Sequence, residues 1–186
     1  MAKIRIFDKE IKYKKIYRNV KYARFEFKTG NLQIILPRNT SNEINLIKKH
    51  QKWIYKKASF IERVVSDSKK LKLNLRRSVN EFKREIRQMV QDSAKNIGVS
   101  INSVAFRKMK TKLGSCSCRG ELTINSLLRF LPERLIEYIV FHEVLHRIHR
   151  NHGIRFQTAM EQKFPEGKIL EEKLLTYWLL VKRRTP

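Results

Sequence analysis

Polar and apolar positions alternate at the start of the chain, as they do along a half-buried β-strand. The alternation runs through residues 3–7, 22–27 and 32–36, and the polar turn at 28–31 joins the last two segments. A short turn containing glycine between two such segments predicts an antiparallel hairpin. Because proline interrupts strand pairing, Pro37 is expected to end the third segment. We therefore expect the chain to begin with a β region.

The spacing of apolar residues becomes helical after that β region. Apolar residues recur every three or four positions over 42–65, which predicts one helix with Thr40 or Ser41 as its N-cap. Residues 66–78 are polar and basic and predict a linker or a short strand. This change of composition marks the stretch as the boundary between two parts of the chain.

The second part mixes helical and strand-like patterns. Glycines and short polar clusters separate these segments, as expected for connections between elements. The predicted elements are a helix from Asn80, its N-cap, to Ile97 with Gly98 stopping it, a strand over 99–106, two strands within 107–125 joined through 114–120, and helices over 131–152, 156–164 and 169–182.

The helix predicted over 131–152 contains the motif His142-Glu143-Val-Leu-His146. With 3.6 residues per turn, the two histidines lie on one face, about 6 Å apart along the axis. Two imidazoles at that spacing can reach one zinc ion at about 2.0–2.1 Å each. Glu143 then lies beside the metal and is placed to take a proton from a water molecule. The motif predicts two metal ligands and one general base.

A catalytic zinc has three protein ligands and an open position, so a third ligand is needed. His149 shares the motif's face in a continuous helix, but it would lie about 10 Å from the first motif histidine, too far to converge on one ion. His152 can turn back only if the helix stops after His146. Asn151 and Gly153 tolerate the left-handed conformation that ends helices, which favours such a stop. We therefore favour His152 and interpret His149 as a solvated side chain.

Positive charge is concentrated before the metal helix. The net charge is +25, and residues 1–120 contain 31 Lys and Arg against 9 Asp and Glu, whereas 121–186 contain 11 against 8. Such a field attracts polyanions, so DNA or RNA is a candidate partner of a basic surface in 1–120. A lysine-rich proteome or a high-temperature habitat gives similar charge without a partner. No zinc-finger or RNA-recognition signature is visible in the sequence.

Two other features bear on the class of protein. No run of about 20 apolar residues is present, so we expect no membrane span and a cytoplasmic location. Cys116 and Cys118 are the two cysteines, one residue apart. That spacing suits a disulfide poorly and is a weak metal signal, so we interpret both as ordinary thiols.

Several segments taken together resemble the YgjP-like metallopeptidases, relatives of the SprT-like zinc proteases. The resemblance implies an α+β, minimal zincin fold: a small, mostly antiparallel sheet, an active-site helix and an N-terminal β-hairpin and helix subdomain. It differs at Lys112-Leu113, where the family usually has Arg-Trp, and at Gln157, where a Trp is common. The matching segments, in chain order, are the hairpin at 24–37, Trp53-Ile54, Gly114-Ser115-Cys116-Ser117, the strand at 122–125, the motif at 142–146, Asn151-His152 and Phe156.

The resemblance assigns roles residue by residue. It implies that His142, His146 and His152 bind zinc (Zn²⁺) and that Glu143 is the general base of a zinc-dependent metalloendopeptidase. Its substrate would be a protein or peptide, and proteins associated with nucleic acid are candidates because of the basic charge.

We expect two domains, a basic N-terminal region over 1–78 and the metallopeptidase core over 79–186. The alternative is a basic nucleic-acid-binding protein whose zinc site is structural or vestigial. A closed site with His149 or Cys118 as a fourth ligand would favour the alternative, and an open three-ligand site would favour the enzyme.

Overall fold

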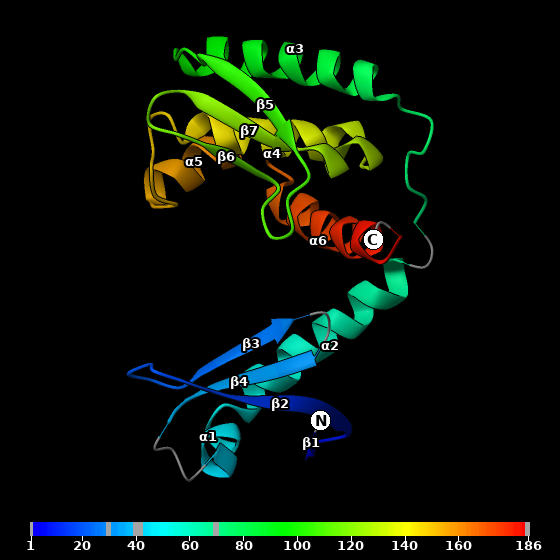
Figure 1. Ribbon diagram of the computed structural model, residues 1–186, viewed down its shortest axis with the longest axis vertical. Helices are drawn as coiled ribbons and strands as arrows, with labels where there is room; N and C mark the ends of the chain where they lie inside the picture. Colours follow the sequence, from blue (N-terminus) through cyan, green and yellow to red (C-terminus); the bar gives the residue numbers. More distant parts are fainter. Residues whose placement is uncertain (1, 29–30, 39–42, 69–70, 185–186) are drawn as a thin grey trace. The chain divides into compact units, whose positions relative to one another are not determined.

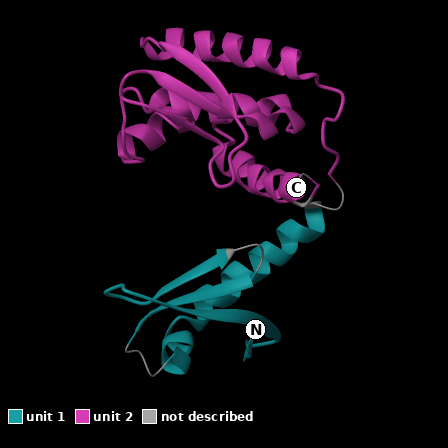
Figure 2. Cartoon of the chain, viewed as in Figure 1, with its two compact units in different colours: residues 1–69 teal, residues 70–186 magenta. Residues whose placement is uncertain are grey.

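The computed structural model describes residues 2–28, 31–38, 43–68 and 71–184 (Figure 1). The chain divides into two compact units, unit 1 over Met1–Lys69 and unit 2 over Lys70–Pro186 (Figure 2). The boundary proposed from the sequence lies nine residues further on, after residue 78. Both units combine helices with a sheet, which confirms the α+β class.

Unit 1 contains a four-stranded sheet in the order β1-β2-β4-β3. β3 and β4 pair antiparallel, as the hairpin prediction requires, although residues 29 and 30 of its turn lie outside the described part. β2 was not predicted as a separate strand, and it pairs antiparallel with β1 and parallel with β4. The strand bounds are β1 (Ala2–Ile6), β2 (Lys9–Arg18), β3 (Arg24–Lys28) and β4 (Asn31–Pro37).

Two helices, α1 (Glu43–Lys49) and α2 (Gln51–Ser68), replace the single helix predicted over 42–65. They are separated at His50, whose amide still bonds to the carbonyls of Leu46 and Ile47 at 3.2 and 3.1 Å. The predicted caps, Thr40 and Ser41, lie outside the described residues. Both helices pack on one face of the sheet, where their buried residues Ile47, Ile54 and Ala58 meet Ile11, Tyr13, Leu32, Ile34 and Leu36.

The first helix of unit 2 is α3 (Val79–Ile97), whose N-cap is Ser78 and not Asn80. The Ser78 hydroxyl accepts from the Glu81 amide at 3.2 Å, while the Glu81 carboxylate accepts from the Ser78 amide at 3.3 Å. This reciprocal capping box satisfies two backbone donors, which a cap at Asn80 would not do. Gly98 ends the helix in the left-handed conformation at φ 75°, as predicted.

The sheet of unit 2 is mixed and not mostly antiparallel. Its order is β5 (Ser103–Arg107), β7 (Glu121–Asn125), β6 (Gly114–Cys116). β6 pairs antiparallel with β7, whereas β5 pairs parallel with it. The chain reverses direction twice between β5 and β7, so β7 runs the same way as β5. In the sheet, β7 lies between β5 and β6.

The metal-motif helix, α4 (Glu133–Leu145), lies at the centre of unit 2, in contact with α3, α6, β6 and β7. Ile136, Val140 and Val144 are fully buried along it. A helix enclosed in this way is a rigid support for the side chains at its end. The remaining elements are the short 3₁₀ helix η1 (Ser126–Phe130), α5 (Ile154–Lys163) and α6 (Gly167–Arg184).

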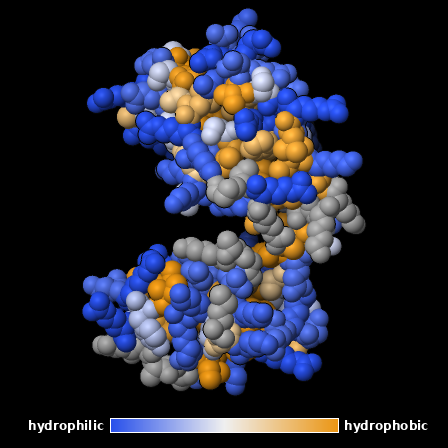
Figure 3. Space-filling model, turned by 45° about the vertical axis from the view of Figure 1, so that its right-hand side comes forward, coloured by the Kyte–Doolittle hydropathy of each residue, from blue (hydrophilic) through white to orange (hydrophobic). Residues whose placement is uncertain are grey.

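Hydrophilic residues cover much of the visible face of each unit, with apolar groups showing between them (Figure 3). Across the described residues, every helix is too short or too polar to cross a bilayer.

Candidate metal centre

The end of α4 positions the two motif histidines. The helix stops at Leu145, and the His149 amide then bonds to the Leu145 carbonyl at 3.0 Å in a tight right-handed turn. His142 and His146 remain one turn apart, with ring centroids 5.0 Å from each other. The predicted stop is correct, but its predicted cause is wrong. Gly153 has φ −72°, and Phe7 is the one non-glycine with positive φ among the described residues, so no left-handed residue ends this helix.

The chain then returns His152 to the two motif histidines. Nε2 of His152 lies 3.0 Å from Nε2 of His142, and one ligand nitrogen from each of the three imidazoles lies within 4.8 Å of the others. Within the described part of the chain, neither His149 nor Cys118 belongs to this cluster. The His149 carbonyl oxygen instead lies 2.9 Å from His146 Nδ1, where it can accept a hydrogen bond that fixes the ring.

α5 holds the returning segment in place. Phe156 contacts all three imidazoles, with ring centroids 4.9 Å from His142 and His146 and 4.7 Å from His152. The side-chain amide of Gln157 donates a hydrogen bond to the backbone carbonyl of His152 at 3.2 Å. The side chain that departs from the family pattern therefore braces the segment carrying His152, a role that sequence reasoning did not find.

Burial changes the pKa of two groups at the centre. Burial, assisted by repulsion from the neighbouring imidazoles of His146 and His152, lowers the pKa of His142 to about 4. Burial also raises the pKa of Glu143 to about 7, and the positive charge of Lys112 opposes that rise. His142 is thus a neutral imidazole near pH 7, the form in which histidine binds a metal.

Gly114, the first residue of β6, makes room for Glu143. A Cβ at position 114 would lie 2.6 Å from Glu143 Cγ and 3.0 Å from its Cδ and Oε1. The strand backbone therefore passes directly against the carboxyl group, and only glycine permits that approach. The sequence signalled this position only as part of a turn at 114–117.

Asn125 fastens the loop before β6 to the sheet and is fully buried. Its amide donates to the carbonyls of Met109 and Lys112 at 2.8 and 2.7 Å, and its oxygen accepts from the Leu127 amide at 3.1 Å. Ser117, at the other end of β6, accepts through its hydroxyl from two amides of its own turn and is a turn residue. These bonds hold the strand that lies against Glu143.

Two hollows meet at the histidine cluster, and His142 and His152 line both. The first, about 560 Å³, runs along β6, and Glu143, Arg147 and Arg150 also line it. The second, about 740 Å³, lies over α5 and the start of α6. Its lining combines apolar side chains with acidic ones, notably Tyr138, Phe156, Met160, Phe164, Glu161 and Glu171.

A buried helix with two histidines, a third histidine from the following loop and an adjacent carboxylate is the arrangement of a metal-dependent hydrolase. The profile of the family described as YgjP-like, metallopeptidase domain, matches residues 63–177, more than half of the sequence. The chain belongs to this family. Membership implies a metal ion and a protein or peptide substrate.

Two solved structures of archaeal metallopeptidase zymogens are similar to the chain. Abylysin of Pyrococcus abyssi is 22% identical with a TM-score of 0.46, and the match covers 50% of this chain and 93% of that one. Jannalysin of Methanocaldococcus jannaschii is 28% identical with a TM-score of 0.46, covering 50% and 89%. A search of curated proteins gave no match.

Proposed function

We propose that this protein is a zinc-dependent metalloendopeptidase of the HExxH…H type. In this proposal His142, His146 and His152 hold the zinc and Glu143 is the general base. The convergence of three imidazole nitrogens within 4.8 Å carries the proposal. A tetrahedral zinc with ligands at about 2.0–2.1 Å places their nitrogens about 3.3–3.4 Å apart, close to the 3.0 Å between Nε2 of His142 and Nε2 of His152.

The chemistry of the donor set supports zinc and an open site. Three neutral imidazoles suit zinc better than magnesium or calcium, which prefer oxygen ligands. His149 and Cys118, the candidates for a fourth ligand, are not members of the described cluster. An open fourth position favours a catalytic role over a structural one.

In the proposed mechanism zinc supplies a Lewis acid that acidifies water and polarises the scissile carbonyl. Glu143 takes the proton from the attacking water and delivers it to the leaving amine. Gly114 lets the backbone of β6 lie against this carboxyl group. β6 is an edge strand of its sheet and lines the first hollow, so an extended peptide can pair with it beside Glu143.

The decisive experiment compares wild type with Glu143→Gln for zinc content and for hydrolysis of an unfolded protein such as casein. The amide keeps the size of the side chain but cannot take a proton. We therefore expect about one zinc in both proteins and a loss of hydrolysis of at least about 100-fold in the variant. Glu133→Gln is the matched control, because Glu133 is exposed at the other end of α4. Wild-type hydrolysis by Glu143→Gln would refute the mechanism.

We further propose that nucleic acid is a partner, so that proteins bound to it become substrates. The excess of 31 basic over 9 acidic residues in 1–120 motivates this. The alternative function, a basic nucleic-acid-binding protein with a structural or vestigial zinc site, predicts zinc and DNA binding without hydrolysis by wild type. The same pair of assays therefore separates the two functions.

A further inference from the structure

The sheet of unit 1 has two different faces. Along β2, Ile11 and Tyr13 belong to the core that packs against α1 and α2, together with their partners on β4 such as Leu32. Successive side chains of a strand point to opposite faces. The residues between them, Lys12 and Lys14, therefore lie on the face without helices.

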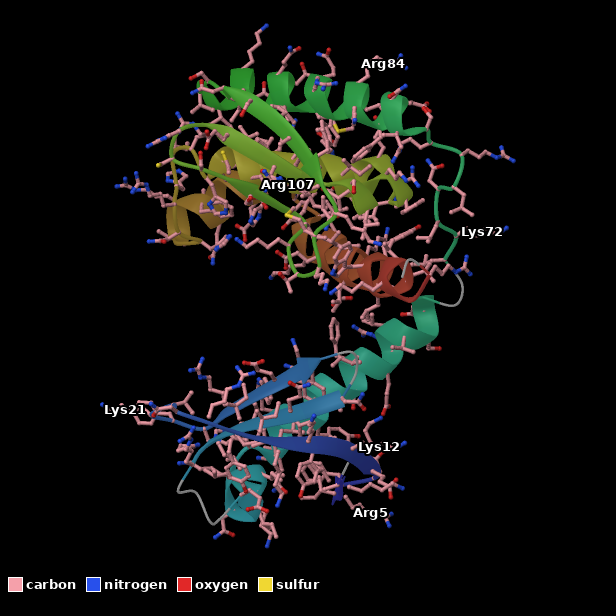
Figure 4. All side chains as sticks on the ribbon, viewed as in Figure 1. Arg5, Lys12, Lys21, Lys72, Arg84 and Arg107 are labelled. Atoms are coloured by element: carbon pink, nitrogen blue, oxygen red, sulfur yellow. The ribbon has the colours of Figure 1, made fainter. Side chains whose placement is uncertain are left out.

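This second face carries most of the exposed positive charge of the sheet. The pairing register places Lys3 opposite Lys12 and Arg24 opposite Ile35, so these residues share the face. Figure 4 shows Arg5 and Lys12 projecting outward from unit 1. We call this surface the open basic face, and its described basic residues, all exposed, are Lys3, Arg5, Lys12, Lys14, Arg18 and Arg24.

Acidic side chains neutralise the face only in part. Glu10 and Glu26 are its acidic members by register, and Glu10 pairs with Lys3 at 2.8 Å. Six basic against two acidic described residues leave an excess of four positive charges on one side of one sheet.

The lysines on the helix side of the sheet have a different environment. Lys9 pairs with Glu62 of α2, and Lys15 pairs with Glu43 of α1. Helix carboxylates thus neutralise Lys9 and Lys15, whereas the opposite side of the sheet keeps its excess of four positive charges. Residues 1–69 as a whole contain 18 Lys and Arg against 6 Asp and Glu.

We propose that the open basic face binds the phosphate backbone of nucleic acid. The proposal deepens the partner part of the proposed function and is independent of the peptidase part. Neighbouring strands lie about 4.8 Å apart and alternate residues of one strand about 6.6 Å apart, so the six basic side chains form a two-dimensional array that can contact several phosphates. Contacts of this kind read charge and not sequence.

The composition of the face favours nucleic acid over a membrane surface. The exposed large apolar residues described in unit 1 are Phe7, Tyr17, Tyr22, Ile44 and Trp53. None of these occupies a strand position of the open basic face, whose apolar members by register are the half-buried Ile16 and Pro37 and the buried Ile35. Stable attachment to a bilayer usually needs an inserted apolar group besides basic charge.

The test measures the affinity of the full-length chain for a fluorescent 20-base-pair DNA duplex by anisotropy, between about 50 and 200 mM salt. The open-face variant is Lys12→Glu, Lys14→Glu, Arg24→Glu. The matched control, Lys49→Glu, Lys52→Glu, Lys56→Glu, makes the same charge change on exposed helix positions of the same unit. Vesicles of phosphatidylserine are the competing probe.

Each phosphate contact contributes about 0.9 to the slope of log affinity against log salt, so the open-face variant should lower the slope by about 2–3. Its affinity at about 50 mM salt should fall at least about 30-fold, while the control stays within a few-fold of wild type. Equal weakening of both variants would show that only net charge matters and would overturn the proposal. Absence of duplex binding by wild type, or a preference for the vesicles, would overturn it as well.

Two further measurements keep the outcome interpretable. Circular dichroism checks that each variant folds, and Lys12→Gln, Lys14→Gln, Arg24→Gln replaces the glutamate variant if it does not. Casein hydrolysis without DNA should be unchanged in the open-face variant, because no changed side chain lies in unit 2. Glu143→Gln should bind the duplex normally, so a failure of this proposal differs from a failure of the peptidase proposal.

Discussion

An alanine at position 114 would place a methyl group against the side chain of Glu143. The added Cβ would lie 2.6 Å from Glu143 Cγ, whereas ordinary contact begins at 3.4 Å, so one of the two must move by about 0.8 Å. Cγ is only two bonds from the backbone of α4, which is packed on several sides and cannot easily yield. The carboxyl group or β6 must therefore be displaced.

The loss of hydrolysis rate that this displacement causes can be estimated. A displacement of about 1 Å at a reacting group can reduce the rate about 100-fold, equivalent to about 2.7 kcal/mol of transition-state stabilisation. We expect Gly114→Ala to lower kcat for peptide hydrolysis by about that factor. Zinc content should stay at the wild-type level, because the three atoms nearest to the added methyl all belong to Glu143 and none to a proposed ligand.

The measurement is kcat and KM on a fluorogenic peptide, with zinc content and thermal unfolding recorded for the same samples. Gly153→Ala is the matched control, since a Cβ there meets nothing within 4 Å and its φ of −72° suits alanine. Wild-type kcat in Gly114→Ala, with the protein folded and loaded with zinc, would refute the claim that the carboxyl group needs this space.

Four other substitutions test the metal ligands and the structure of unit 2. His152→Ala should lower zinc affinity more than about 100-fold, and His149→Ala should leave it close to wild type; equal effects, measured by competition with a chelator, would contradict the ligand assignment. Asn125→Ala removes four hydrogen bonds from a buried site and should lower the free energy of unfolding in urea by about 2–4 kcal/mol. Ser78→Ala removes the cap of α3 and should cost about 0.5–2 kcal/mol in the same assay, with no effect on zinc content.

Local sequence patterns predicted an element well where its conformation depends on residues that are close together in the sequence. The periodicity of α4, the hairpin of β3 and β4 and the stop at Gly98 all follow from neighbouring residues, and the structure contains them. The N-cap of α3 was misplaced because both Ser78 and Asn80 are suitable N-cap residues. Only the reciprocal hydrogen bonds between Ser78 and Glu81 decide between them.

Pairings between distant segments were harder to predict. Nothing local in β2 indicates that it lies parallel to β4, or that β7 enters between β5 and β6. Register and direction depend on which apolar faces meet across the sheet, and many arrangements bury the same residues. The same reason explains why a mixed sheet replaced the expected, mostly antiparallel one.

The sequence by itself determined the spacing of His142 and His146, since an α-helix always places residues four apart on one face. It also determined how much positive charge the chain carries. Tertiary structure decided which third histidine returns to the cluster, how closely Gly114 approaches Glu143, and which face of the first sheet keeps its charge. These outcomes depend on non-local packing and on ion pairs between separate elements, which short-range propensity does not encode.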